Sequence, residues 1–415
     1  MTEPRSPART KRRRAAERRF RLYGAASIVA ALGALAVLLG TMIAQGWPAF
    51  VQTHIRLQVD FAEPLIDPAG RRDARTLGDA NYQVLARRAL FKEFPKVKRR
   101  RDRRRLGKLL SVGAEYQLHD MVLAEPDLIG TKRTVWLLAS DDADQYIKGH
   151  GGRLGAKQTA WLDALAERGA VERKFNAGFF TSGDSREPEM AGIWGAAAGS
   201  LLTMAVALLL AFPLGIATAL YLEEFAPKGR LTDAIEVNIN NLAAVPSIVY
   251  GLLGLAVLLN FFGLPRSAPL VGGMVLALMT MPTIIIAGRA ALAAVPPSIR
   301  EGALAIGASP MQVVLHHVLP LAFPGMLTGA IIGAARALGE TAPLLMIGMV
   351  AFIVDIPGSV TDPATVLPVQ IYLWADSPER AFVERTAAAT VVLLGFLILM
   401  NLVAVVLRRR FERRW

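Results

Sequence analysis

Long apolar blocks alternate with polar segments along this chain, and six of the blocks are long enough to cross a membrane. A bilayer core of about 30 Å requires roughly 20 apolar residues in an α-helix. The first block is too long for a removed signal peptide and lacks a clear small-residue cleavage site after it, so we expect it to be a retained anchor. The six candidate spans are about Tyr23–Ala44, Ile193–Leu222, Ile239–Phe262, Leu270–Ala293, Phe323–Val354 and Ala387–Leu407.

A polar segment of about 47–190 lies between the first two spans and is long enough to form a small domain. His54–Phe61 alternates polar and apolar residues, as a half-buried strand does, and Thr134–Leu138 is a second candidate strand. Ser140–Asp144 can begin a helix, and Thr159–Arg168 suits a short amphipathic helix closed by the glycine that follows it. We therefore predict an all-α polytopic membrane protein with a small α+β insert domain.

The net charge of +13 could suggest a nucleic-acid-binding protein, but the basic residues are clustered where they flank membrane spans. Such clusters are topology signals, because cytoplasmic loops of membrane proteins carry an excess of lysine and arginine. Another basic run, about Lys92–Lys108, lies within the insert, where a solvated or lipid-facing role is favoured over phosphate collection. The terminal clusters are Lys11–Arg14 with Arg18–Arg19, and Arg408–Arg410 with Arg413–Arg414.

These signals place both termini in the cytoplasm, and six crossings are consistent with that placement. The topology also puts the Glu301 loop inside the cell and the Asp355–Glu384 loop outside. The expected division of the chain is a cytoplasmic segment 1–22, a first span 23–46, an extracytoplasmic insert domain 47–190, a core of five spans 191–407, and a cytoplasmic end 408–415.

The sequence shows no catalytic centre. Cysteine is absent, and the five histidines lack metal-like partners at useful spacing. A glycine-rich phosphate loop of the G-x-x-x-x-G-K-[ST] kind is also missing. We expect no metal site and no cofactor bound by this chain, so any ATP hydrolysis must come from another chain.

The loop after the fourth span has the pattern of two short helices. Pro297 suits the first position of a helix, and Gly307 suits its C-terminal stop. Ser309–Gln312 reads as a capping box with proline at the first helical position, so a second helix should begin there. Pro320 is expected to end or kink that second helix. The result would be a compact knob around a glycine turn.

This loop, about 297–320, resembles the EAA loop of ABC importer permeases, with Glu301, Gly307 and Leu319-Pro320 at the family's spacing. Gly302 replaces the first alanine of the pattern, and His317 stands where the family usually has an aliphatic residue. The resemblance implies that the knob contacts an ATPase subunit. The residues expected at that contact are Arg300, Glu301, Gly302, Ala303, Gly307 and Pro320.

Two membrane segments extend the resemblance. Arg336–Leu345 (RALGETAPLL) looks like the transmembrane signature of phosphate-specific permeases of the PstA type, and Asn241–Gly251 resembles the PSIVYG element of the same family. The resemblance covers roughly Phe175–Leu407, so the first span and the insert form an N-terminal extension. It implies a non-catalytic permease subunit of an ATP-driven importer for inorganic phosphate in a bacterial inner membrane.

The resemblance also implies partners. They are a paralogous permease subunit, a dimer of ATPase subunits that binds ATP and magnesium, an extracytoplasmic phosphate-binding protein and membrane lipids. Three alternatives stay open: a PstC-type paralogue, a permease for another oxyanion (molybdate, sulfate or phosphonate), and a membrane sensor or scaffold. The Gly339–Leu345 string favours the PstA type, and no cytoplasmic segment is long enough for the output domain of a sensor.

Arg336, Glu340 and Thr341 are the candidate residues of the substrate pathway. A charge near the middle of a bilayer costs about 2.5–3.5 kcal/mol on insertion scales, so such residues usually face a protein interior or cavity. A spacing of four puts Arg336 and Glu340 on one face of a helix, about 6 Å apart along its axis. The arginine can offer a planar fork of donors to phosphate, and the glutamate can hold the arginine. The alternative is a structural interhelical ion pair.

Overall fold

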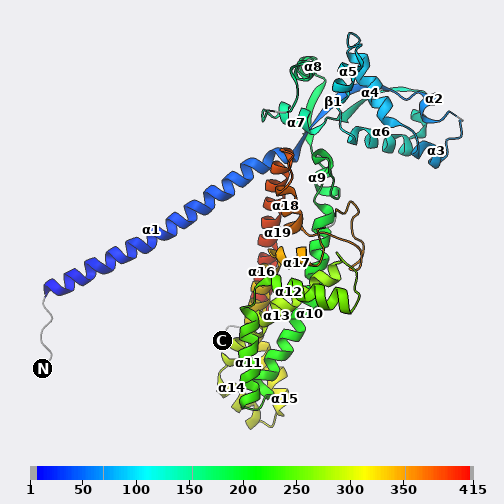
Figure 1. Ribbon diagram of the computed structural model, residues 1–415. Helices are drawn as coiled ribbons and strands as arrows, with labels where there is room; N and C mark the ends of the chain where they lie inside the picture. The colour runs from blue at the N-terminus through cyan, green and yellow to red at the C-terminus, as the bar shows by residue number, and fades with distance from the viewer. Residues whose placement is uncertain (1–6, 69, 152, 351, 412–415) are drawn as a thin grey trace.

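The computed structural model describes residues 7–68, 70–151, 153–350 and 352–411. A bundle of long helices carries a small α+β unit beyond one end, and α1 (Pro7–Gly46) projects away from the bundle (Figure 1). Within the described ranges, five helices are long and apolar enough to cross a membrane, or up to six if one bent pair counts as a span. Arg413 and Arg414 of the predicted C-terminal cluster, and residues 1–6, lie outside these ranges.

The α+β unit, Val51–Phe175, is called the insert here. Its centre is a three-stranded antiparallel sheet in the order β2-β1-β3. β1 (Val51–Asp60) lies between β2 (Lys132–Leu138) and β3 (Val171–Phe175), with His54 opposite Leu138. Alternate residues of β1 are buried, and the two strands predicted from the sequence are confirmed.

Short helices cover this sheet, and their apolar residues join those of β1 in one hydrophobic core. The helix predicted at about Thr159–Arg168 is confirmed as α8, and the glycine after it, Gly169, has a φ of +64°. The elements are η1 (Trp47–Phe50), which precedes the sheet, then α2 (Glu63–Ile66), α3 (Ala74–Gly78), α4 (Tyr82–Glu93), α5 (Arg100–Gly107), α6 (Gly113–Ala124), η2 (Pro126–Leu128), α7 (Asp141–Ile147) and α8 (Ala156–Glu167).

The centre of the bundle is formed by α10 (Trp194–Leu220), α13 (Pro269–Ala293) and α16 (Leu319–Leu338). Small residues let these helices approach closely, as is common between membrane helices. A Cβ atom added to Gly329 would lie 2.4 Å from the Cβ of Ala287. The last helix, α19 (Ala381–Phe411), packs against α16 and α1.

The third predicted span is not one continuous helix. α11 (Arg230–Ala243) and the segment formed by α12 (Ser247–Leu253) with the π-helical η5 (Gly254–Phe261) meet at a bend of 104°. The break falls at Pro246, which lacks a backbone N–H and disfavours helical geometry in the residue before it. The predicted span over about Ile239–Phe262 is therefore present only as part of a bent pair and not as one continuous helix.

The fifth predicted span also differs. α16 ends at Leu338, and a non-helical link leads to the short α17 (Ala342–Met346). A continuous helix over Phe323–Val354 was therefore wrong. The loop expected after this span contains a helix that was not predicted, α18 (Leu367–Ala375), which packs against α19.

Pro320 does not end the helix that precedes it. The helical segment runs from Pro310 to Leu338 and contains a π-helical stretch, η6 (Val313–Val318), just before α16. The wider π-helical turn releases backbone carbonyls close to the proline, which has no N–H to offer them. A similar π-helical turn, η4 (Tyr221–Phe225), closes α10.

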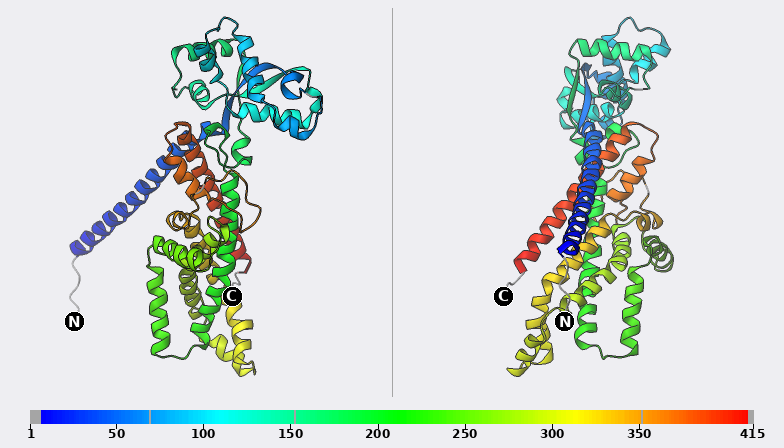
Figure 2. Two further views of the ribbon diagram at one scale, coloured as in Figure 1. Left: turned by 45° about the vertical axis from the view of Figure 1, so that its right-hand side comes forward. Right: turned by 90° about the vertical axis from the view of Figure 1, so that its left-hand side faces the viewer.

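A hydrophobic junction lies in the segments that connect the insert to the bundle. It gathers Phe179 from α9 (Gly178–Thr181), Trp374 from α18 and Phe382 from α19. η3 (Pro188–Met190) lies beside it, and both views in Figure 2 show the start of α19 next to the insert. The Trp374 indole Nε1 donates to Asp184 Oδ1 at 2.9 Å, so the junction also contains polar bonds.

We expect the stability of the folded chain to depend on the protonation of Asp141. Burial first, and then the nearby charges of Glu189, Asp142, Asp144 and Glu384, raise the pKa of Asp141 to about 7. The folded chain therefore binds this proton more tightly than the unfolded chain, and stability falls as the pH rises from about 4 to about 7. Asp141→Asn, which stays neutral, should lose this part of the pH dependence.

Thermal unfolding of the purified chain between pH 4.5 and 8 measures the effect. The difference in Tm between Asp141→Asn and the wild type should increase with pH. Asp376→Asn, at an exposed position, is the matched control and should follow the wild type. Parallel curves for Asp141→Asn and wild type would show that Asp141 is already ionised throughout this range.

Candidate functional site

The knob predicted from the sequence lies at the end of the bundle opposite the insert, called the loop end here (Figure 1). α14 (Pro297–Ala305) is followed by Gly307, whose φ of +90° makes the turn. α15 (Pro310–Gln312) then begins with the predicted capping box. The Ser309 N–H donates to Gln312 Oε1 at 2.9 Å, and the Gln312 N–H donates to Ser309 Oγ at 3.4 Å. The local geometry of the loop was therefore predicted correctly.

The surface of the knob is partly apolar. Glu301, Gly302 and Gly307 are exposed, whereas Ala303 is buried and Pro320 is half-buried. In this conformation Ala303 is shielded from a partner's surface, and Pro320 is only partly accessible. Apolar side chains that the sequence argument did not select are exposed around the turn, with Ile306 at 81%. A large aliphatic residue beside a turn glycine is the signal that could have identified them. They are Leu304, Ile306 and Met311.

Arg300 points into the chain instead of outward. Its Nη2 lies 2.7 Å from Glu224 Oε1 and 3.0 Å from the Leu292 carbonyl oxygen, and its Nη1 donates to the Val295 carbonyl oxygen at 2.7 Å. These bonds fix α14 against the C-terminal end of α13 and against η4. A direct ATPase contact by Arg300 would require breaking them, so the structure points to a supporting position for this residue.

A second arginine ties the same region together. Arg289 of α13 lies 3.3 Å from Glu223 Oε2 in η4 and 2.7 Å from Glu236 Oε1 in α11. Sequence reasoning missed this network. The available signal was the adjacent pair Glu223-Glu224 at the end of an apolar block. Two neighbouring carboxylates beside a membrane span indicate that basic side chains lie close to them. One ion pair thus joins the knob to η4, and two more join η4 and α11 to α13.

The two charges assigned to the pathway do lie together, but not on one helix. Arg336 is in the last turn of α16, where a positive charge is favoured by the helix dipole, and Glu340 follows the helix end. Arg336 Nε lies 3.6 Å from Glu340 Oε1, and their side chains are 47% and 19% exposed. Thr341 is half-buried in the link to α17. The prediction that both residues lie on one helical face was therefore wrong, whereas the predicted contact between their side chains is present.

The two motifs of the membrane core contact each other. Gly251 of α12 lies against α17, and a Cβ atom placed on it would be 2.6 Å from the Pro343 Cα. Gly254, one turn later, would place a Cβ atom 3.1 Å from a side-chain carbon of Ile347. The PSIVYG element therefore packs directly on the segment that follows Arg336 and Glu340, and fixes the position of that link.

Gly251→Val should therefore damage the core of the bundle. The three extra carbons would meet backbone atoms, which cannot rotate away, and overpacking of this kind typically costs about 1–3 kcal/mol. We expect a lower Tm for the purified chain and a lower membrane yield. Gly395→Val on α19 is the matched control, because nothing lies within 4 Å of a Cβ atom there. Equal Tm values for the two variants would contradict the close packing.

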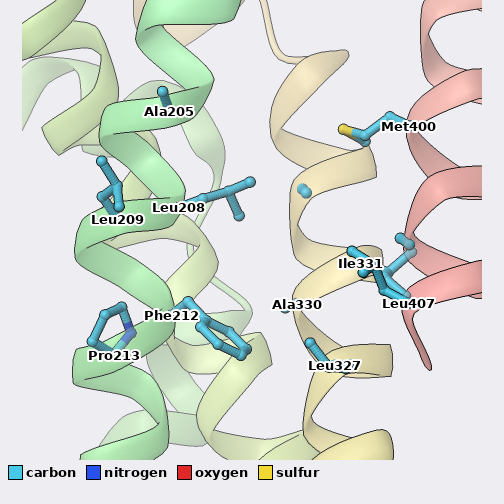
Figure 3. A pocket seen from close by; sticks show the side chains of 12 residues that line it. Ala205, Leu208, Leu209, Phe212, Pro213, Leu327, Ala330, Ile331, Met400 and Leu407 are labelled. Atoms are coloured by element: carbon cyan, nitrogen blue, oxygen red, sulfur yellow. The ribbon is translucent and has the colours of Figure 1, made fainter. Parts of the chain in front are cut away.

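A groove of about 400 Å³ runs between α10 on one side and α16 and α19 on the other (Figure 3). Its lining is made of alanine, leucine, isoleucine, phenylalanine, proline and methionine side chains, so it offers no donor to an anion. Phe212 and Met400 face it from opposite sides. This groove suits lipid chains or apolar helices.

In the part of the chain that the structure describes, no group of three histidine, cysteine, aspartate or glutamate residues could hold a metal ion.

Comparison with known proteins divides the chain in two. Residues 211–415 match the family described as binding-protein-dependent transport system inner membrane component, and residues 7–156 match a domain of unknown function, DUF3333. Phosphate transport system permease protein PstA 1 of Mycobacterium tuberculosis is 33% identical over 223 residues, which cover 54% of this chain and 72% of that protein.

Phosphate transport system permease protein PstC of Haemophilus influenzae is 33% identical over 191 residues, covering 40% of this chain and 60% of that protein. Among solved structures, an inward-facing MetNI methionine ABC transporter is similar with a TM-score of 0.41 at 20% identity, over 53% of this chain and 98% of that chain.

Proposed function

The chain belongs to the binding-protein-dependent transport system inner membrane component family of ABC transporter permeases, and on that premise we propose that it imports inorganic phosphate as half of a translocation pathway. It is a non-catalytic permease subunit, and the ATPase of such a transporter is a separate chain. The observation that carries the choice of substrate is the 33% identity, over most of the relative's length, to a protein named for phosphate transport.

The proposed membrane topology has the loop end in the cytoplasm and the insert outside. In both views of Figure 2, α1 and α19 extend from the side of the insert toward the loop end, where the knob lies, which supports this orientation. The proposed parts are a cytoplasmic segment 1–22, a first span 23–46, an extracytoplasmic insert domain 47–190, a permease core 191–407 and a cytoplasmic end 408–415, all in a bacterial inner membrane.

The proposed partners follow from that orientation. An ATPase dimer, which would hold ATP and magnesium, docks on the exposed face of the knob through Glu301, Gly302 and Ile306. Arg300 supports this contact through Glu224 without forming it. A paralogous permease subunit supplies the other half of the pathway, and an extracytoplasmic phosphate-binding protein delivers the substrate.

In the proposed cycle, closure of the ATPase dimer moves the knob, and the paired charges at the loop end transmit that motion into α13 and α11. Arg289 links both helices to η4, so the three elements move together. Movement of the packed helices then opens the pathway on one side at a time. Arg336 neutralises the anion, and Glu340 holds the arginine when phosphate is absent.

The test is uptake of radiolabelled phosphate into proteoliposomes that contain the chain with its permease partner, ATPase and binding protein. Unlabelled phosphate should compete, and molybdate, sulfate and methylphosphonate should not. No uptake of labelled phosphate, with uptake of labelled molybdate, sulfate or methylphosphonate by the same complex, would replace the substrate while keeping the permease assignment. The similarity to PstC leaves a PstC-type position as the second candidate, and it predicts the same uptake from a complex with a PstA-type partner.

A further inference from the structure

Charged residues are buried where the insert meets the start of α19. Glu384 is 7% exposed and Arg385 is 4% exposed. Burying charges costs free energy unless opposite charges and hydrogen bonds compensate for the lost water. Neither residue contributes to the knob or to the Arg336 pair, so the proposed transport function leaves this arrangement unexplained.

The Glu384 carboxylate has three partners, and all of them come from the insert. Its Oε1 accepts from Gln145 Nε2 at 2.9 Å and lies 2.9 Å from His150 Nδ1. Its Oε2 lies 3.1 Å from the ammonium group of Lys148, whose side chain is only 4% exposed. Gln145 belongs to α7, Lys148 directly follows the end of that helix, and His150 comes two residues later. One side chain of the last membrane helix therefore holds three groups of the insert.

Lys148 extends the connection to the central strand of the insert. Its Nζ lies 2.6 Å from Asp144 Oδ2, and Asp144 Oδ1 accepts the backbone N–H of Thr53 in β1 at 2.8 Å. Asp144 and Thr53 are themselves buried. α19 is thus bonded to the middle of the sheet and not merely to a surface loop, and rotation of the insert about its connections would break several buried bonds at once.

Arg385, the next residue of α19, is enclosed from the other side. Its guanidinium carbon lies 5.5 Å above the Phe179 ring, and its Nη1 donates to the Ala191 carbonyl oxygen at 3.4 Å. The charges of Asp144, Glu384 and Glu189 act favourably on it. Two adjacent residues of α19, one acidic and one basic, therefore each have compensating charges close by.

We propose that Glu384 and Lys148 form a clamp that makes the insert a rigid extension of α19, so that the insert moves with the last membrane helix during the transport cycle. α19 runs unbroken for 31 residues, about 46 Å, so a displacement at its other end reaches the clamp. Glu384 and Lys148 are positioning residues. The rigid attachment stands on the contacts alone, whereas the movement during the cycle rests on the proposed transport function.

The chain has no cysteine, so spin labels can be attached at chosen positions without background. One label goes on Glu167→Cys at the exposed end of α8, and the other on Leu399→Cys at an exposed position of α19. Pulsed electron paramagnetic resonance then gives the distance between them in the assembled complex in lipid nanodiscs, with and without ATP. The wild type should show one narrow distance that is the same in both states.

Glu384→Gln should broaden this distance distribution and lower phosphate uptake, by roughly tenfold if the clamp carries a typical coupling between sites. Glu172→Gln is the matched control, because that glutamate is on β3 with a side chain 54% exposed, and it should leave both readouts unchanged. A narrow distribution in Glu384→Gln would overturn the clamp. So would a wild-type distance that shifts between the two nucleotide states.

Glu384→Gln leaves the Lys148 charge buried with one partner fewer and could prevent assembly. The triple variant Asp144→Asn, Lys148→Met and Glu384→Gln removes the ammonium group together with both carboxylates that it contacts. It should assemble, because no buried carboxylate loses its ammonium partner and the asparagine oxygen can still accept the Thr53 N–H. The proposal expects its distance distribution to be broad, and a narrow one would refute the clamp. A wild-type complex with a narrow distance but no phosphate uptake would contradict the proposed substrate and leave the clamp intact.

Discussion

Replacement of Arg336 by glutamine is expected to abolish phosphate uptake while the chain still assembles and its ATPase partner still hydrolyses ATP at the basal rate. Glutamine keeps hydrogen-bonding capacity but loses the positive charge and the planar fork of donors that fit an oxyanion. A hydrogen bond to a charged group contributes about 1.5–3 kcal/mol, so its loss in the pathway should slow transport strongly. Uptake in proteoliposomes and size-exclusion chromatography of the complex measure the two effects separately.

Arg266→Gln is the matched control for this variant. Arg266 is exposed in the loop between η5 and α13, so its replacement should change neither uptake nor assembly. Normal uptake by Arg336→Gln would remove Arg336 from the pathway. Failure of that variant to assemble, with Arg266→Gln intact, would instead identify the Arg336–Glu340 contact of 3.6 Å as a structural ion pair.

Gly307→Val should uncouple the ATPase from transport. Gly307 has a φ of +90°, a conformation that costs residues with a Cβ atom roughly 1–2 kcal/mol and a β-branched valine at least as much. No neighbouring atom lies within 4 Å of an added Cβ, so backbone strain is the expected cause and not a clash. The turn should relax into another conformation and move Ile306 and α15 away from their docking positions.

The measurement for Gly307→Val is the rate of ATP hydrolysis with and without substrate-loaded binding protein. We expect the stimulated rate to fall to the basal rate while the chain remains in the membrane. Gly229→Val is the matched control, because Gly229 also has open space around it but has an extended φ of 175° that any residue adopts. Full stimulation in Gly307→Val would show that this turn does not position the ATPase contact.

Local patterns in the sequence predicted much of the fold because their causes are local. Proline at a helix start, glycine at a positive φ and the Ser309–Gln312 capping box each depend on residues a few positions apart. The alternation of polar and apolar residues that predicted β1 is also a local pattern. The bend of 104° at Pro246 was harder to predict, because proline also occurs inside continuous membrane helices when neighbours satisfy the freed carbonyl groups.

The site was predicted less completely because its decisive contacts join residues far apart in the chain. Arg300 was assigned to the ATPase contact from its place in the loop. In the structure its guanidinium instead binds the carboxylate of Glu224, 76 residues earlier. Glu384 was likewise assigned to an external loop from its position in the sequence alone. Its partners Lys148 and Gln145 lie more than 230 residues earlier, and only the folded chain brings them together.

The proposed coupling of ATP hydrolysis to phosphate import can be measured as ATP hydrolysis by the purified complex in lipid. The complex contains the chain, its permease partner and the ATPase, and the binding protein is added with phosphate, sulfate or molybdate in turn. We predict that only phosphate-loaded binding protein raises the rate above the basal value. An equal or larger rise with sulfate or molybdate, or no rise with any of them in a fully assembled complex, would contradict phosphate-specific coupling.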